Sequence, residues 1–293
     1  MTLEEQIRNC RKQAGISQEK MAELIGVSRQ AITKWENGTG TPDITNLVAI
    51  AELFQISLDE LLMNEKREKK QSEYLYVSTT EYDIDGIKSY DIKLGSAYTV
   101  MICSSEGEKI KISLFSNIIK ELQRDYKIKL DDVKNRIDVE LQRLNGATET
   151  DAKESMVIQI DIPQKYIDRL EVAVNAKRLE LMDVECKSIE FDGKVAEVCL
   201  KGCKSIVDIN CNLDMSVEVM SHEGAIEINQ ISAISKVKVP MNFVFRAKKK
   251  GIGTAIYYEE HSERVEAFSL EDADNYIELN GMKSELYITR EEA

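Results

Sequence analysis

The sequence predicts two domains of different fold class: an all-helical domain at residues 1–64 and an all-β domain at residues 74–293. Near the N-terminus, apolar residues recur at the spacing of amphipathic helices. Residues 65–73 contain no apolar side chain and have the mixed charge of a linker. From residue 74 onward, apolar and polar residues alternate with the period of a strand. A chain of 293 residues has room for about two such domains.

Residues 1–64 are expected to form five short helices, because each apolar stretch follows a capping residue or a chain start. The residues that open the five helices are Leu3, Ser17, Ser28, Asp43 and Ser57. Ser57 is followed three residues later by Glu60, which is the spacing of a capping box. The second and third helices are separated by a tight turn at Gly26, and this is the arrangement of a helix-turn-helix motif.

The motif resembles a known family. The run SQEKMAELIGVSRQAITKWENG at residues 17–38 is similar to the Cro/cI-type repressor domain, also called the xenobiotic-response-element family. Pro42-Asp43 and the run ISLDELL at residues 56–62 match the fourth and fifth helices of that domain. The resemblance implies a bacterial or phage transcriptional regulator that binds double-stranded DNA at specific sequences.

The resemblance also implies a role for individual side chains. The third helix, Arg29 to Glu36, is expected to enter the major groove. Four side chains are expected to read base edges, namely Arg29, Gln30, Thr33 and Lys34. Three are expected to contact phosphates, namely Gln18, Ser28 and Asn37.

Net charge does not support this expectation. The chain carries −13, and residues 1–64 hold nine acids against six Lys and Arg, a balance of −3. DNA-binding domains usually show a basic surface. The prediction of DNA binding therefore depends on the motif and not on the overall charge.

In the β domain, triplets with an apolar-polar-apolar pattern recur. They begin at Leu179, Ile189, Val198, Val207, Val217, Ile226 and Val237. The steps between them are 10, 9, 9, 10, 9 and 11 residues, and Gly193, Gly202 and Gly224 fall between triplets. This spacing predicts either a β-solenoid with two strands per coil or a sandwich.

The β domain also resembles the adhesin-type β-solenoid domains of unknown function, which bring no catalytic residues with them. The matching features are a repeated serine pattern at Ser188, Ser205 and Ser216, and two consecutive strands at residues 127–130 and 136–139. The β domain is therefore expected to serve assembly or sensing. We expect a homodimer on an inverted-repeat operator, with a small molecule or a protein as effector.

A self-cleaving repressor is the alternative from an enzyme class. Such proteins use a nucleophilic serine and a lysine base, and Ser155 precedes Lys194 by 39 residues. The glycine-rich surroundings of that nucleophile and a cleavage pair in the linker are both missing. The sequence also lacks the phosphate-loop, dinucleotide-binding and HExxH motifs. We therefore expect no catalytic residues, no enzymatic activity and no cofactor.

The chain is expected to be cytoplasmic and without a membrane partner. It shows no secretory signal and no apolar run near the ~18 residues of a membrane span. Its six cysteines are expected to be small buried residues in a reducing compartment. With two histidines, and with Cys199 and Cys203 four residues apart, a zinc site is not expected.

Overall fold

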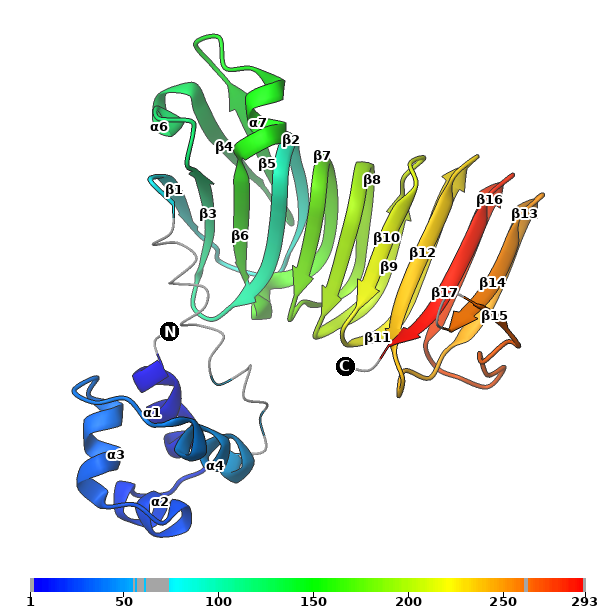
Figure 1. Ribbon diagram of the computed structural model, residues 1–293. Helices are drawn as coiled ribbons and strands as arrows, with labels where there is room; N and C mark the ends of the chain where they lie inside the picture. Colours follow the sequence, from blue (N-terminus) through cyan, green and yellow to red (C-terminus); the bar gives the residue numbers. More distant parts are fainter. Residues whose placement is uncertain (1–2, 55, 57–60, 62–73, 261–262, 292–293) are drawn as a thin grey trace. The chain divides into compact units, whose positions relative to one another are not determined.

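The computed structural model describes residues 3–54, 56, 61, 74–260 and 263–291. These residues fall into two compact units, a helical unit at Met1–Tyr74 and a strand unit at Leu75–Ala293 (Figure 1). The expected linker at residues 65–73 lies outside the described residues.

Four helices of the helical unit follow the expected order. They are α1 (Leu3–Gln13), α2 (Gln18–Ile25), α3 (Arg29–Glu36) and α4 (Ile44–Phe54). Their apolar faces meet in one core that includes Ile7, Met21, Ile32 and Ile50, all fully buried. Of the expected fifth helix, Leu61 is helical and buried, whereas Ser57 and Glu60 lie outside the described residues.

The described residues of the strand unit form strands, two short helices and a 3-10 turn. The elements of its first half are β1 (Tyr76–Asp83), β2 (Lys88–Ser105), β3 (Lys109–Ser116), α6 (Leu122–Asp125), β4 (Tyr126–Val133), β5 (Arg136–Arg143), α7 (Glu149–Ser155), β6 (Val157–Pro163), η1 (Gln164–Tyr166), β7 (Ile167–Met182) and β8 (Glu185–Lys201). Those of its second half are β9 (Cys203–Asn210), β10 (Met215–Val219), β11 (His222–Ile231), β12 (Ile234–Pro240), β13 (Arg246–Ile252), β14 (Ala255–Glu260), β15 (Glu263–Val265), β16 (Tyr276–Met282) and β17 (Glu285–Glu291).

Most of these strands stack as parallel coils with two arms. In arm A, residues of successive coils pair in the order Tyr90, Leu170, Ile189, Val207, Ile226 and Ile277. In arm B, the order is Val100, Leu179, Val198, Val217, Val237 and Ile288. All twelve side chains point inward and are buried between the arms. Tyr90 and eleven aliphatic side chains, stacked on equivalent positions, thus form the core.

The stacking confirms the predicted two strands per coil. The triplets that begin at residues 189, 207 and 226 lie in arm A, and those that begin at 179, 198, 217 and 237 lie in arm B. Each coil therefore takes about two triplets. Two architectures were expected, a solenoid and a sandwich. The parallel register between coils is that of a solenoid.

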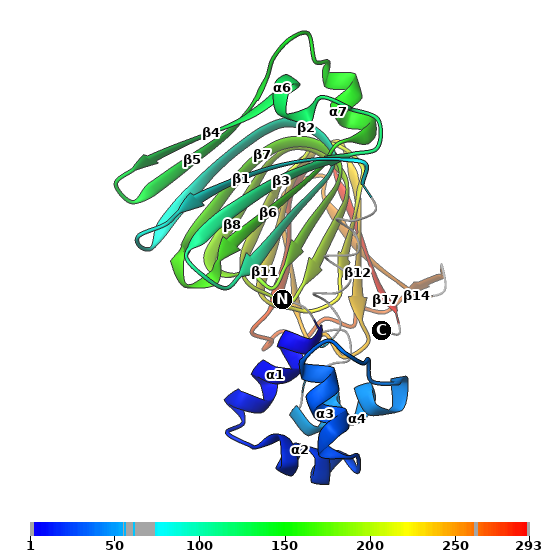
Figure 2. The same cartoon turned by 90° about the vertical axis from the view of Figure 1, so that its left-hand side faces the viewer.

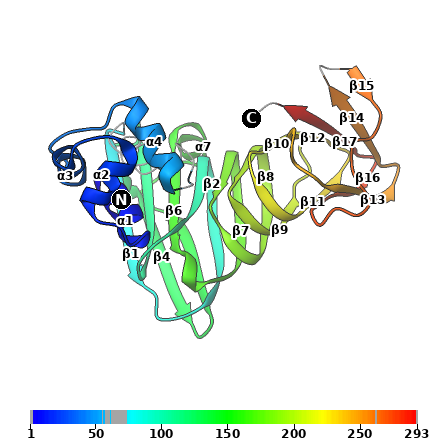
Figure 3. The same cartoon turned by 90° about the horizontal axis from the view of Figure 1, so that it is seen from below.

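The last coils do not follow chain order. β16 pairs with β11 on one side and with β13 on the other, and β17 lies in the same way between β12 and β14. The chain therefore builds the terminal coil, β13–β14, before it returns to fill the position inside it. Figures 1 and 3 show β16 and β17 within the row and β13 and β14 at its end.

At the opposite end of the stack, one parallel strand adds to each arm of β2, and antiparallel strands follow. In arm B, β6 pairs with β2, β3 with β6, and β1 with β3. In arm A, β5 pairs with β2, and β4 forms a hairpin with β5 (Figure 2). The sequence predicted these two strands, at residues 127–130 and 136–139, but not their pairing. Both extensions add strands to β2, so the row ends in β1 on one arm and in β4 on the other.

Glycine is required at the corner between the two arms of β8. Gly193 has φ +147° and pairs with Val174 of the preceding coil. A Cβ atom at Gly193 would lie 2.1 Å from the carbonyl oxygen of Val174. Since Val174 belongs to the backbone ladder, it cannot move away without breaking the register.

We predict that Gly193→Ala lowers the stability of the strand unit by about 1–3 kcal/mol, because the added methyl group must displace backbone. The measurement is urea unfolding of the full chain, followed by the strand signal in circular dichroism. Gly86→Ala is the matched control, since no atom lies within 4 Å of the added Cβ. Equal midpoints for the two variants would contradict the prediction.

Candidate nucleic-acid interface

Helices α2 and α3 are joined by a short turn, and three capping residues fix where the two helices begin and where α2 ends. The Ser17 hydroxyl accepts a hydrogen bond from the backbone N–H of Lys20 and caps α2, and Ser28 caps α3 by accepting from Ala31. Gly26 ends α2 in the left-handed conformation, with φ +81°. These caps fix where α3 begins, and therefore which of its side chains face outward.

Helix α3 has one anchored face and one exposed face. Ile32 and Trp35 are buried in the core of the helical unit. Arg29, Gln30 and Lys34 are all exposed at the surface. In the part of the chain that the structure describes, no hydrogen bond or ion pair engages these three side chains. A helix held by its apolar face thus presents a guanidinium, an amide and an ammonium group to solvent.

The other expected contact residues already have partners within the unit. Thr33 is half-buried, and its hydroxyl lies 3.0 Å from the carbonyl oxygen of Arg29 and 3.2 Å from Oε1 of Gln18. The Gln18 amide donates to Glu36 at 2.7 Å, which ties the start of α2 to the end of α3. Asn37 ends α3, and its Oδ1 accepts from Arg8 at 2.9 Å.

A buried ion pair, which the sequence analysis did not predict, joins α1 to α3. Glu36 is 1% exposed and receives two hydrogen bonds from Arg11, at 2.5 Å from Nε and 2.9 Å from Nη2. Arg8 donates to the Glu36 carbonyl oxygen. The signal in the sequence was helical spacing, because Glu36 lies four residues after Ile32 and so on the same buried face.

The protonation of this pair follows from its partners. Burial alone would raise the pKa of Glu36, but hydrogen bonds from Arg11 and Gln18 and the charges of Arg11 and Arg8 outweigh burial and lower it. The hydrogen bond to Glu36 raises the pKa of Arg11. Both groups are therefore charged at neutral pH, and one carboxylate holds together three helices, α1, α2 and α3.

Comparison with known proteins identifies this unit. Residues 7–61 match the family model described as helix-turn-helix. The HTH-type transcriptional regulator YqaE of Bacillus subtilis is 40% identical over 65 residues, which are 22% of this chain and 56% of the relative. Residues 7–61 are a Cro/cI-type helix-turn-helix domain. The chain spans about half the length of this relative, so the match concerns the domain and not the whole protein.

A solved structure extends the comparison of the helix-turn-helix domain. The P22 c2 repressor, crystallised with a synthetic operator, is 36% identical over 21% of this chain and 92% of the solved chain, with a TM-score of 0.20. The strand unit is similar to a candidate cell adhesion protein from Clostridium sporogenes. That match has 13% identity, a TM-score of 0.37 and covers 74% of this chain and 100% of the other. A likeness of this size says nothing about function.

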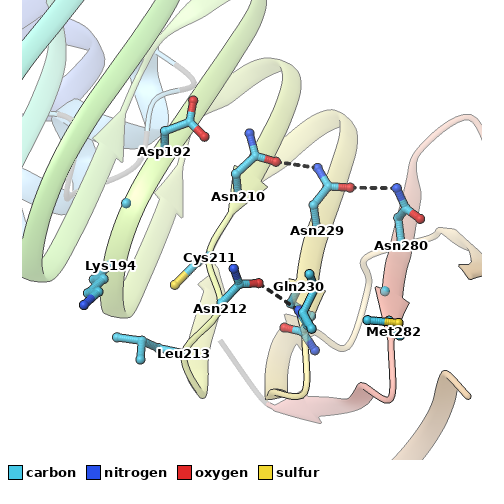
Figure 4. Close-up of a pocket in the computed structure, with 13 residues that line it drawn as sticks. Asp192, Lys194, Asn210, Cys211, Asn212, Leu213, Asn229, Gln230, Asn280 and Met282 are labelled. Carbon is cyan, nitrogen blue, oxygen red and sulfur yellow. Dashed lines mark hydrogen bonds between the residues drawn. The ribbon is translucent and has the colours of Figure 1, made fainter. Parts of the chain in front are cut away.

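Outside the helix-turn-helix domain, a groove of about 590 Å³ follows the end of arm A. Asn210, Asn229 and Asn280 of successive coils line it as an amide ladder (Figure 4). The Asn229 amide donates to Asn210 at 2.8 Å, and Asn280 donates to Asn229 at 3.0 Å. Because the amides bond to one another, the ladder stabilises the stacking of the coils.

A column of carboxylates runs beside this ladder on the outer face of arm A. Its members occupy paired positions on seven adjacent strands: Asp138, Asp91, Glu171, Glu190, Asp208, Glu227 and Glu278. Burial, together with the charges of Glu227 and Glu190, raises the pKa of Asp208. Among the described residues, no group of three or more His, Cys, Asp or Glu could hold a metal ion.

The serine and lysine of the self-cleaving alternative lie in separate elements. Ser155 is the last residue of α7, and its hydroxyl donates to the carbonyl oxygen of Asp151 at 2.8 Å and accepts from Ser116. Lys194 lies at the corner of β8 and lines the groove. Within the described residues, no hydrogen bond joins Ser155 to Lys194.

Among the described residues, no helix has the length and apolar character that a membrane crossing needs.

We predict that Glu36→Ala destabilises the helix-turn-helix domain by about 3 kcal/mol, because it leaves the largely buried guanidinium of Arg11 without a carboxylate partner. Trp35 is the single tryptophan of the chain, so urea unfolding followed by its fluorescence reports on this domain alone. Glu23→Ala is the control, since Glu23 forms an exposed pair with Lys20 and should cost at most about 1 kcal/mol.

Glu36 should also make the domain sensitive to acid. Its pKa is lower in the folded state than the ordinary value of about 4.3. The stabilisation is therefore complete above about pH 4.3 and is lost as the pH falls through the lower folded pKa. The stability difference between the parent and Glu36→Gln should shrink over that range, and a difference that stays constant down to pH 2 would contradict the assignment.

Proposed function

We propose that the chain is a transcriptional regulator that binds specific sites on double-stranded DNA through α3, as a homodimer on an inverted repeat. The observation that carries this proposal is the outward-facing row of Arg29, Gln30 and Lys34 on a helix anchored within a domain homologous to transcriptional regulators. The P22 c2 relative was crystallised with a synthetic operator. DNA-binding regulators of this kind act in the cytoplasm, and we assign the chain to that compartment.

The outward-facing groups of α3 match base edges. Arg and Lys donate to guanine O6 and N7, and the amide of Gln30 can form two hydrogen bonds with adenine N6 and N7. Thr33 differs, because its hydroxyl already has partners in Gln18 and Arg29. We therefore assign the methyl group of Thr33 to an apolar contact with a thymine methyl group.

Three other residues retain hydrogen-bond donors for phosphate. Ser28 accepts a bond as a helix cap, so its own hydroxyl hydrogen remains available at the positive end of the α3 dipole. Gln18 uses one amide N–H for Glu36 and has a second to donate. Asn37 accepts from Arg8 through Oδ1, which leaves its NH2 group to donate. These contacts would position α3 without reading sequence.

The strand unit is poorly suited to phosphate contact. Residues 1–64 carry −3 of the total charge of −13 and residues 65–73 carry +1, which leaves −11 for residues 74–293. The carboxylate column of arm A contributes to this charge, although three of its members pair with Lys93, Arg136 and Lys250. Such a surface repels DNA at low salt. We therefore assign the strand unit to assembly or effector sensing and not to DNA contact or catalysis.

Dimerisation follows from the small footprint of one helix. A single recognition helix reads about four base pairs, too few to define a site in a genome. Two copies related by a two-fold axis read two half-sites about 34–36 Å apart. Joining the copies through their strand units raises the effective concentration of the second α3 at its half-site.

We predict that Arg29→Ala and Gln30→Ala each weaken binding to a selected operator by about 1–3 kcal/mol and relax the preference at one or two base pairs. Asn37→Ala should weaken binding to all sequences alike, because it removes a phosphate contact. The measurement is a titration of operator variants at fixed salt, and Glu23→Ala serves as the control on an exposed residue outside α3. Unchanged affinity for both the Arg29 and Gln30 variants would show that α3 does not read the bases.

We also predict a mass in light scattering of twice the 33.3 kDa of one chain. DNA fragments selected from a random pool should contain inverted repeats with half-sites about one helical turn apart. A monomeric protein at tens of micromolar, or selected sites without symmetry, would contradict the dimer while leaving DNA recognition by α3 in place.

A further inference from the structure

Several strands at the ends of the row are hydrogen-bonded on one side alone. Among the described residues, β1 pairs only with β3, β4 only with β5, and β13 only with β16. Figure 1 shows β1 at one end of the row and β13 at the other. An unpaired edge presents a series of backbone N–H and C=O groups to which another strand can add. The side chains on each edge decide whether such addition is favourable.

The edge of β13 is protected by positive charge. Arg246, Lys248 and Lys250 share one face of this strand. Lys249 lies on the opposite, core-facing side, where it pairs with the buried Leu279, and yet it is exposed. Lysines along an edge, and a charged side chain on its inner face, are the features that oppose strand addition. β4 similarly carries alternating charges at Lys127, Lys129 and Asp131 on its exposed face.

The edge of β1 has no such protection. Its sequence, YVSTTEYD, contains no Lys, Arg, Pro or Gly and is rich in residues that favour strands. Val77 is 46% exposed and Tyr82 is 38% exposed. Its two charges, Glu81 and Asp83, have the same sign and lie at one end of the strand. An antiparallel partner of the same sequence would therefore place each acid opposite an uncharged residue.

We propose that β1 pairs with β1 of a second copy, antiparallel and across a two-fold axis at Thr79, and so forms the interface of the homodimer. This inference rests on the dimer proposed above and names its surface. In this register Val77 faces Glu81 of the second copy and Tyr76 faces Tyr82. The two paired β1 strands join the sheets of both copies into one continuous sheet. The two pairs formed by Tyr76 and Tyr82 add aromatic contact between the copies.

The register also suits the placement of two helix-turn-helix domains. Tyr76 lies opposite Tyr82 of the second copy, so the two Tyr76 residues are separated along the edge by six positions, or about 20 Å. Residues 62–73 give each chain a reach of at most about 40 Å. The two domains can therefore reach half-sites about 34–36 Å apart from one dimer edge.

The experiment changes the charge of two outward-facing positions in β1 and measures the dimer dissociation constant of the full chain by light scattering and sedimentation. Val77→Glu/Thr79→Glu brings three pairs of carboxylates face to face across the axis, so the constant should rise at least tenfold. Val77→Lys/Thr79→Lys changes the same positions but places the lysine at position 77 of each copy opposite Glu81 of the other. These two attractive pairs offset the one repulsive pair of lysines at position 79 on the axis. The lysine variant should therefore dimerise within about threefold of the parent.

A second control adds the same negative charge at the far end of the row. Ile252→Glu/Thr254→Glu introduces two carboxylates at the end of β13 and just after it, and should leave the dissociation constant unchanged. This control separates a local effect from the overall charge of −13. Mixing the glutamate and lysine variants of β1 should produce a heterodimer, because opposite charges then meet at position 79 on the axis. The same mixing result would show that the glutamate variant is folded.

The outcomes distinguish the interface from the dimer itself. If the parent is a dimer and the glutamate variant dimerises equally well, the β1 interface is overturned. The proposed dimer then stays in place and uses another surface. Equal dissociation of the glutamate and lysine variants would also overturn it, because the effect would not depend on charge. A monomeric parent would overturn both proposals together.

Discussion

The strand unit depends on one constraint, the hydrogen-bonded register between parallel coils. Neighbouring strands lie about 4.8 Å apart, so each residue is stacked against the residues at equivalent positions in the coils on both sides. Inward positions therefore form columns of Val, Ile and Leu, and outward positions form the amide ladder and the carboxylate column. The same closeness excludes a side chain at Gly193, where the backbone of Val174 occupies the space. Stacking thus determines core, surface and corners at once.

The local pattern of the sequence was sufficient to predict strands but not their neighbours. The triplets at ten-residue steps located the arms of the central coils, because alternation depends only on which side chains face the core. The insertion of β16 and β17 between β11–β12 and β13–β14 leaves no trace in that spacing, since any coil with an apolar inner face can occupy any position in the stack. The order of coils is decided by packing between distant segments.

The helical unit shows a related limit. Caps such as Ser17 and Ser28 and the turn at Gly26 were predictable, because each acts on residues within a few positions. The role of Glu36 depended on Arg8 and Arg11, which lie more than 20 positions away in another helix. A charged residue near a helix end is usually solvated, although its spacing from Ile32 placed it on the buried face. Gln18 has two functions, because one N–H of its amide donates to Glu36 and the second N–H remains available to a phosphate.

The contrast between the two ends of the row bears on how many copies can assemble. An edge that pairs with itself across a two-fold axis is used up in the dimer, so assembly stops at two. Pairing of β1 with the β13 edge of another copy would instead leave an unpaired edge at each end and continue as a filament. The cations of β13, including Lys249 on its inner face, oppose strand addition at that end. A protected end and an unprotected end on one sheet together favour a closed pair, and two recognition helices related by a two-fold axis are what an inverted repeat requires.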